Sequence, residues 1–267
     1  MKILFLGDVV GLSGCRKIAN DLLDQIKKKD IDFVIINGEN ADDTGVGLTK
    51  EICENFFENG VNVITTGNHV WDQKDIMNFI DKENRLLRPK NLFEPAPGRG
   101  FEIYKSKKNY KVGVLNLMGN VFMKKCDDVF KISKDFLDKY NLKKDYDFLI
   151  VDFHGEITSE KNAIGHYFDG KATLVIGTHT HIPTNDARIL KNGTAYQTDA
   201  GMCGDYDSVI GMNKDNSINR FMKKDSTKHF PADGEASLSG VIVNCNLETG
   251  LADSIDSYIF GCLLKNT

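Results

Sequence analysis

Short apolar runs that end near a glycine recur along the chain and predict buried strands. The runs are continuous, rich in β-branched residues and too short to be helices, which is typical of strands covered on both faces. They occupy residues 2–7, 32–38, 61–67, 111–119, 146–155, 172–177 and 193–201.

Helical periodicity separates the first three of these runs. Apolar residues at four-residue spacing follow Ser13 between positions 18 and 26, and they follow Thr49 between positions 52 and 56. We expect Ser13 and Thr49 to be helix N-caps, because their side-chain oxygens can accept a bond from a free backbone N–H of the first turn. The first third is therefore predicted to be β-α-β-α-β.

The later part of the chain changes character. Three segments are spaced like antiparallel strands with turns between them, at 193–201, 237–250 and 253–264. Only 89–100 and 211–237 have the composition of long loops, and long loops in compact domains are often functional. With no repeat and no linker, the sequence predicts one mixed α/β domain over residues 1–267.

Composition and charge exclude several classes of protein. Of the 267 residues, 41% are hydrophobic and 27% charged, which is ordinary for a folded, water-soluble chain. The net charge of −4, without a lysine or arginine cluster, argues against a protein that binds duplex nucleic acid. No apolar run is long enough to span a membrane, and the first residues do not resemble a signal peptide, so we expect a cytoplasmic protein.

The six cysteines, at 15, 53, 126, 203, 245 and 262, contain no CxxC pair. We expect reduced and mostly buried thiols, as is usual for a cytoplasmic protein.

Polar residues follow five of the predicted strands at the point where each one ends. Carboxyl ends of parallel strands meet at one edge of a sheet, so these side chains should converge although they are far apart in sequence. They are Asp8, Glu39, Asn40, Asn68, His69, His154, His179 and His181.

Each of these residues alone has an ordinary interpretation as a turn or cap residue. Five strand ends that carry carboxylates, amides and imidazoles favour a metal site instead. No cysteine is among these residues, which argues against a structural zinc site, and this donor mixture suits iron or manganese. Without His69 there are seven possible donors, too many for one ion, so we expect two ions, the arrangement that supports phosphoryl displacement.

At this point the sequence resembles the calcineurin-like metallophosphoesterases. The matching motifs are GD (7–8), GNH (67–69), HGE (154–156) and GTHTH (177–181). The usual opening DxH is absent, and a glutamate, Glu39 of NGEN, stands where that superfamily has a bridging aspartate. These two departures resemble the YmdB-like 2′,3′-cyclic-nucleotide 2′-phosphodiesterases, and further motifs extend that resemblance to about residue 250.

The resemblance implies an α/β/β/α sandwich of mixed sheets flanked by helices, with the site at the carboxyl ends of the strands. It also implies that Glu39 bridges two metal ions and that the branch tends toward homo-oligomers. One ion would be held by Asp8, Glu39, Asn40 and His181, and the other by Glu39, Asn68, His154 and His179.

The segment that carries His179 and His181 is expected to be extended, which would put both imidazoles on one side of the chain and Thr180 on the other. This spacing permits each histidine to bind a different ion. The remaining imidazole, His69, is implied to be the proton donor, because a protonated imidazole helps a ribose alkoxide to leave. A metal-bound hydroxide would be the nucleophile. His166 and His229 are expected to be surface or structural residues.

The leading hypothesis is a dinuclear phosphodiesterase that converts 2′,3′-cyclic nucleotides or other small phosphodiesters. A phosphomonoesterase or protein phosphatase is the alternative among enzymes, because the same metal pair serves both reactions. A regulatory protein that binds RNA or a partner, with the metal site as a ligand sensor, is the alternative from another class. The acidic balance and the full donor set argue against this last hypothesis.

Overall fold

The computed structural model describes residues 1–93, 95–224, 228–261 and 263–267. Its elements follow in chain order as β1 (Lys2–Val10), α1 (Gly11–Lys29), β2 (Phe33–Asn40), α2 (Lys50–Glu58), β3 (Val63–Thr65), the 3₁₀ helix η1 (Lys74–Asn78), β4 (Phe101–Lys105), β5 (Lys111–Met118), α3 (Val129–Lys139), β6 (Phe148–His154), α4 (Thr158–Tyr167), β7 (Leu174–Thr178), β8 (Arg188–Ile189), β9 (Ala195–Gln197), β10 (Met202–Asp205), α5 (Lys214–Phe221), β11 (Ala236–Cys245) and β12 (Ala252–Phe260). The predicted β-α-β-α-β opening is confirmed.

Two mixed sheets of six strands each form the centre of the molecule. The first has the order β12-β11-β10-β1-β2-β3, and β11 also pairs directly with β1. Strands β1, β2, β3 and β10 are parallel, whereas β11 and β12 are antiparallel to their neighbours. The second sheet has the order β4-β5-β6-β7-β9-β8, with four parallel central strands and an antiparallel strand at each edge.

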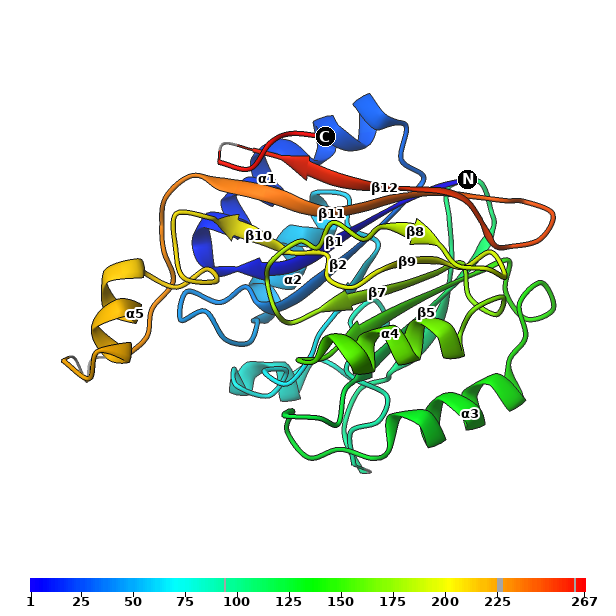
Figure 1. The fold of residues 1–267 in the computed structure, drawn as a ribbon, viewed down its shortest axis with the longest axis horizontal. Helices are drawn as coiled ribbons and strands as arrows, with labels where there is room; N and C mark the ends of the chain where they lie inside the picture. Colours follow the sequence, from blue (N-terminus) through cyan, green and yellow to red (C-terminus); the bar gives the residue numbers. More distant parts are fainter. Residues whose placement is uncertain (94, 225–227, 262) are drawn as a thin grey trace.

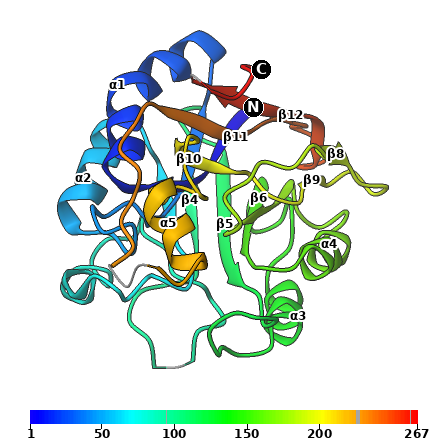
Figure 2. The ribbon, with the colours of Figure 1, turned by 60° about the vertical axis from the view of Figure 1, so that its left-hand side comes forward.

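The sheets pack face to face, and helices cover both outer faces (Figures 1 and 2). Between the sheets lies an apolar layer that joins residues such as Phe5 and Ile35 of the first sheet to Phe148 and Ile176 of the second. A second cluster joins the first sheet to α1 and α2, and a third joins the other sheet to α3 and α4. The predicted α/β/β/α sandwich is therefore confirmed, and its continuous apolar strands are those of doubly covered sheets.

One of the two predicted helix caps is wrong. Thr49 caps α2, because its side chain accepts a bond from the N–H of Ile52. Helix α1 begins earlier than expected, at Gly11, so Ser13 lies inside it. The Ser13 hydroxyl is buried and donates to the carbonyl of Ala232 instead. A contact between distant segments has thus replaced the local cap.

The later strands also depart from the sequence prediction. Segment 193–201 contains β9, which is parallel to β7 and antiparallel only to the short β8. After β9 the chain crosses to the first sheet, where β10 pairs with β1. The predicted loop 211–237 contains α5, which Asn213 caps by accepting a bond from the N–H of Asn216. Glu94 of the other predicted loop, and residues 225–227 of this one, lie outside the described residues.

Two simpler predictions concern the thiols and the absence of a membrane span. The described cysteines are free thiols, buried at 53, 203 and 245 and half-buried at 15 and 126, as expected. Cys262 lies outside the described residues. Across the described part of the chain, no helix combines the length and the apolar character needed to cross a membrane.

Candidate metal centre

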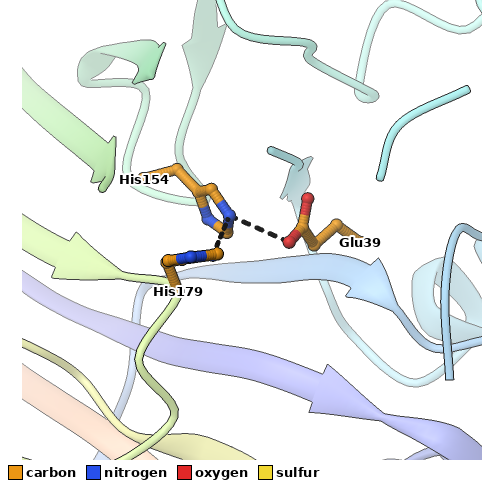
Figure 3. A group of neighbouring side chains, drawn as sticks. All are labelled: Glu39, His154 and His179. Atoms are coloured by element: carbon orange, nitrogen blue, oxygen red, sulfur yellow. Dashed lines mark hydrogen bonds and ion pairs between the residues drawn. The ribbon is translucent and has the colours of Figure 1, made fainter. Parts of the chain in front are cut away.

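Three side chains from separate strands meet at the carboxyl edges of the two sheets (Figure 3). Glu39 comes from the end of β2, His154 from the last position of β6, and His179 directly follows β7. One possible ligand atom from each lies within 4.8 Å of the others. His154 Nε2 is 2.9 Å from Glu39 Oε1 and 3.0 Å from His179 Nδ1. Convergence of these distant residues was predicted, and the structure brings them together.

The other predicted donors surround this trio. Asn68 Oδ1 lies 3.1 Å from His154 Nε2. Asp8 Oδ1, near the end of β1, lies 3.8 Å from His154 Nδ1 and 3.9 Å from His181 Nε2. Asn40 follows Glu39 in β2 and lines the same cavity as Glu39, His179 and His181. All seven donors therefore lie in one region, on both sides of the seam between the sheets.

Three of these donors carry buried oxygen atoms without a hydrogen-bond partner among the described residues. They are Asp8 Oδ1, Glu39 Oε1 and Asn40 Oδ1. A buried polar atom that lacks a partner destabilises a fold by roughly 1–3 kcal/mol. Oxygen atoms of this kind, together with imidazoles, are the donors that hard or borderline metal ions prefer. The residues present therefore fit the ions that the sequence predicts.

Charge interactions shift the pKa values of the central trio. Burial would raise the pKa of Glu39, but His154 and His69 outweigh it and hold that pKa at about 2. Burial would lower the pKa of His154, but Glu39 and Asp8 outweigh it and raise the value to about 9. Burial and the neighbouring His154 lower the pKa of His179 to about 3. The region thus holds the Glu39 carboxylate ionised and favours positive charge on the His154 ring.

Gly67 gives these groups the space they need. A Cβ atom at this position would overlap the ring of His154 and the carboxylate of Glu39. The backbone before Asn68 therefore approaches both side chains as closely as only glycine allows.

The backbone that carries His179 and His181 is not extended, so that prediction is wrong. Strand β7 ends at Thr178, and the two histidines have left-handed φ angles of 95° and 66°. Their side chains diverge: His179 faces His154 and Glu156, whereas His181 faces Asp8 and donates through Nδ1 to the carbonyl of Ile210. Non-glycine residues in this region are strained and are held there by their surroundings.

A buried ion pair holds this turn in place. Asp199 Oδ2 lies 2.6 Å from Lys161 Nζ, and both side chains are almost fully buried. The same oxygen accepts bonds from the N–H and the hydroxyl of Thr180, at 3.1 and 2.6 Å. The other oxygen accepts from the N–H of Gly201. Because Thr180 stands between the two histidines, Asp199 fixes both of them.

A second buried carboxylate supports His154 from behind. His154 Nδ1 lies 2.9 Å from the hydroxyl of Thr178, which donates to Asp152 Oδ1 at 2.7 Å. The side chains of Asn37 and Thr65 also donate to Asp152. Burial raises the pKa of Asp152 to about 6, although His154 and these hydrogen bonds oppose the rise. This chain favours a proton on Nδ1 and leaves Nε2 directed at the other donors, the usual arrangement behind a ligating histidine.

His69 lies at the open side of the region. Its N–H donates to Glu39 Oε2 at 2.9 Å, and its ring Nδ1 lies 2.6 Å from Asp72 Oδ2. Lys124 donates to the carbonyl of Asn68 at 2.6 Å and lies 3.5 Å from Asp72 Oδ1. The ring is about 29% exposed and lines the cavity, so its Nε2 edge is the one available to a ligand.

Sequence reasoning missed several of these supporting residues. Asp152 had a signal, since a carboxylate in the middle of an apolar run must find partners or a function. Lys161, Asp199 and Asp72 gave none that separates them from ordinary surface charges. His229, expected to be surface or structural, is half-buried and lines the cavity, while His166 is exposed as expected.

Comparisons with known proteins show which family this chain is similar to. The family model for YmdB-like proteins matches residues 4–258. The 2′,3′-cyclic-nucleotide 2′-phosphodiesterase of Bacillus subtilis (strain 168) is 42% identical over 257 residues, 96% of each chain.

Two crystal structures are similar over nearly the whole chain. A hypothetical protein from Thermus thermophilus superposes with a TM-score of 0.90 at 36% identity, covering 98% of this chain and 99% of its own. A novel phosphatase from Mycoplasma pneumoniae superposes with a TM-score of 0.89 at 38% identity, covering 98% and 93%.

Proposed function

Because the chain belongs to the family of YmdB-like proteins, we propose that it is a phosphodiesterase that hydrolyses 2′,3′-cyclic nucleotides and other small phosphodiesters. The relative from Bacillus subtilis supports the reaction class. The observation that carries the proposal is that buried oxygens of Asp8, Glu39 and Asn40 lack hydrogen-bond partners among the described residues and lie beside imidazoles, an arrangement that a bound cation would stabilise.

Two metal ions would be held by the seven donors. Asp8, Glu39, Asn40 and His181 would hold one, while Glu39, Asn68, His154 and His179 would hold the other. The diverging side chains of His179 and His181 support a separate ion for each. Carboxylate, amide and imidazole donors suit iron, with manganese as the alternative. When bound, such ions neutralise phosphate charge and acidify water.

His69 is proposed to donate the proton that the leaving oxygen needs. Asp72 accepts from Nδ1, which fixes the ring and leaves Nε2 facing the cavity. In a 2′,3′-cyclic nucleotide, hydroxide would form a new bond to phosphorus as the bond from phosphorus to O2′ breaks, and a proton from His69 Nε2 would let O2′ leave as a hydroxyl group instead of an alkoxide, which is a poor leaving group. The product would be the 3′-nucleotide. Lys124 steadies Asp72 and the backbone of Asn68 from the solvent side.

The test is metal analysis combined with turnover of 2′,3′-cyclic AMP, bis(p-nitrophenyl) phosphate and p-nitrophenyl phosphate. Glu39→Ala should lose both metal and turnover. Metal-free wild-type protein without turnover on any substrate would sink the enzyme hypothesis and favour a regulatory binding protein. Turnover of the monoester alone would favour the phosphomonoesterase or protein phosphatase.

Variants of the proton donor give a sharper result. His69→Ala should keep its metal but lose about 10²- to 10⁴-fold in kcat on 2′,3′-cyclic AMP. The loss should be much smaller on bis(p-nitrophenyl) phosphate, because p-nitrophenolate leaves without a proton. Asp72→Asn should show the same substrate pattern with a smaller loss. His166→Ala, an exposed histidine away from the cavity, is the matched control. Equal losses on both diesters would contradict the assigned role of His69.

A further inference from the structure

The cavity beside the metal centre has a second wall that the proposed chemistry does not use. The cavity holds about 540 Å³, more than a phosphate group needs and within the range of small-molecule sites. Glu39, Asn40, His69, His179 and His181, which the proposed chemistry uses, line part of it. The rest of the lining is mixed: Thr44, Glu156, Thr180, Lys228 and His229 are polar or charged, and the larger apolar side chains are those of Val46, Ile210 and Met212. These three apolar residues form the second wall.

Ile210 is the unusual residue on this wall. Its φ angle is 48°, in the left-handed region, where a β-branched residue is a rare outlier. Such a conformation costs on the order of 1–2 kcal/mol for a residue other than glycine. Its side chain is 48% exposed, so burial in a core does not offset that cost. Strain of this kind collects at functional sites, and here it is combined with an exposed apolar side chain inside the cavity.

Hydrogen bonds hold the turn that presents Ile210. The N–H groups of Val209 and Met212 donate to each other's carbonyls, at 2.9 and 3.0 Å. Gly211, with φ of 93°, donates to the hydroxyl of Ser208. A tight turn with two left-handed residues normally has Asn, Asp or Gly first, so the backbone does not account for isoleucine. These hydrogen bonds therefore fix the turn from which the Ile210 side chain projects.

The same residue is linked directly to the metal centre. The carbonyl of Ile210 accepts a bond from His181 Nδ1 at 2.8 Å. Ile210 and Met212 line the same cavity as Glu39, His179 and His181, so a ligand whose phosphate lies among the donors can extend its next group along them. Both side chains offer apolar surface, and that of methionine is adaptable, which suits an uncharged ring better than a charged or strongly hydrated group.

From this geometry we infer that Val46, Ile210 and Met212 form a base-binding shelf that receives the nucleobase of the substrate. The inference rests on the proposed function and goes further, because it restricts the preferred substrates to diesters that carry a base. The shelf acts on affinity through the base. It takes no part in breaking the bond to phosphorus.

The experiment compares two substrates that share a five-membered cyclic diester. 2′,3′-Cyclic AMP carries a base, and glycerol 1,2-cyclic phosphate does not. In Ile210→Gly and Met212→Ala, the ratio of kcat/KM for the first over the second should fall about tenfold, chiefly through KM. Ile210→Gly should also unfold at an equal or higher temperature, because glycine relieves the strained φ. Ile189→Ala, a surface isoleucine outside the cavity, should leave the ratio unchanged.

Three other results are distinguishable. If both substrates lose activity equally and metal content falls, Ile210 supports His181 and the shelf is wrong. If the ratio does not change while the wild type cleaves both diesters, the shelf is wrong and the proposed function stands. If metal-loaded wild-type protein cleaves neither diester, the proposed function fails and the shelf fails with it.

Discussion

The carboxylates at the two ends of strand β2 differ in their hydrogen bonding. Asp32, just before the strand, accepts bonds from the N–H of Lys2 and from Lys108 Nζ, at 2.9 and 3.1 Å. These bonds outweigh the effect of burial and lower the pKa of Asp32. At the other end, Glu39 keeps one oxygen without a hydrogen-bond partner among the described residues, and so does Asp8 at the same end of β1.

This difference separates carboxylates that stabilise the fold from carboxylates whose burial destabilises it. At the amino end of β2, the buried Asp32 carboxylate is paired with Lys108, whose side chain is half-exposed. At the carboxyl ends, carboxylates are buried, and Asp8 has a raised pKa because of that burial. Buried charge without full pairing opposes folding and is retained where function requires it. Three variants test this contrast.

The largest expected effect is at Lys161, which pairs with the buried Asp199 at the carboxyl end. Lys161→Met leaves that carboxylate without its cation and should lower the free energy of unfolding by about 3–5 kcal/mol. Urea denaturation measures the loss. Lys108→Met, at the amino end, is the matched control and should lose far less, because Lys108 is half-exposed. If both variants lost the same free energy of unfolding, the ion pairs at the two ends of the strands would contribute equally to stability, which would contradict the contrast.

A smaller effect of opposite sign is expected at Asp8. In protein freed of metal by a chelator, Asp8→Asn should raise the free energy of unfolding by about 1–2 kcal/mol at neutral pH, because it removes a buried charge. The amide oxygen can still accept the N–H of His179. Since the folded pKa of Asp8 is raised, wild-type stability from this group improves as pH falls, and the advantage of Asp8→Asn should shrink. A less stable variant would contradict the contrast. Metal binding should be impaired throughout.

The smallest effect is expected at Asp32. Asp32→Asn should lose up to about 1 kcal/mol of stability at pH 7 while keeping its metal and turnover. The folded pKa of Asp32 is lowered, so its contribution is present above the unfolded value near 4 and is lost as pH falls through the folded value. The difference from wild type should therefore begin to shrink as pH falls below about 4 and should disappear below the folded pKa. A loss of turnover in Asp32→Asn would show that this residue affects the metal centre at the other end of β2, and would contradict the contrast.

Much of the site could be predicted from the sequence because parallel strands impose it. The strands at 2–7 and 32–38 are parallel neighbours in one sheet, and those at 146–155 and 172–177 are parallel neighbours in the other, so the polar residues that follow each pair share the carboxyl edge of their own sheet. The seam between the two sheets, which brings Asp8 toward His154, could not be predicted in this way.

The prediction failed where a distant contact replaced a local preference. Ser13 looked like a cap, yet its hydroxyl bonds to Ala232, more than two hundred positions away. His179 and His181 looked like alternate residues of an extended chain, yet Asp199 draws the N–H and hydroxyl of Thr180 into a turn between them. No local pattern contains such a partner.

The sequence by itself thus determined the mixed α/β class and the chemical identity of the donors, because both depend on local periodicity and on strand ends. Only the tertiary structure decided how the donors face each other and what holds them. The Asp199 to Lys161 pair, the Asp152 chain behind His154 and the turn at Ile210 join segments separated by tens of residues. Hydrogen bonds across such distances select left-handed backbone angles that no residue's own preference would choose.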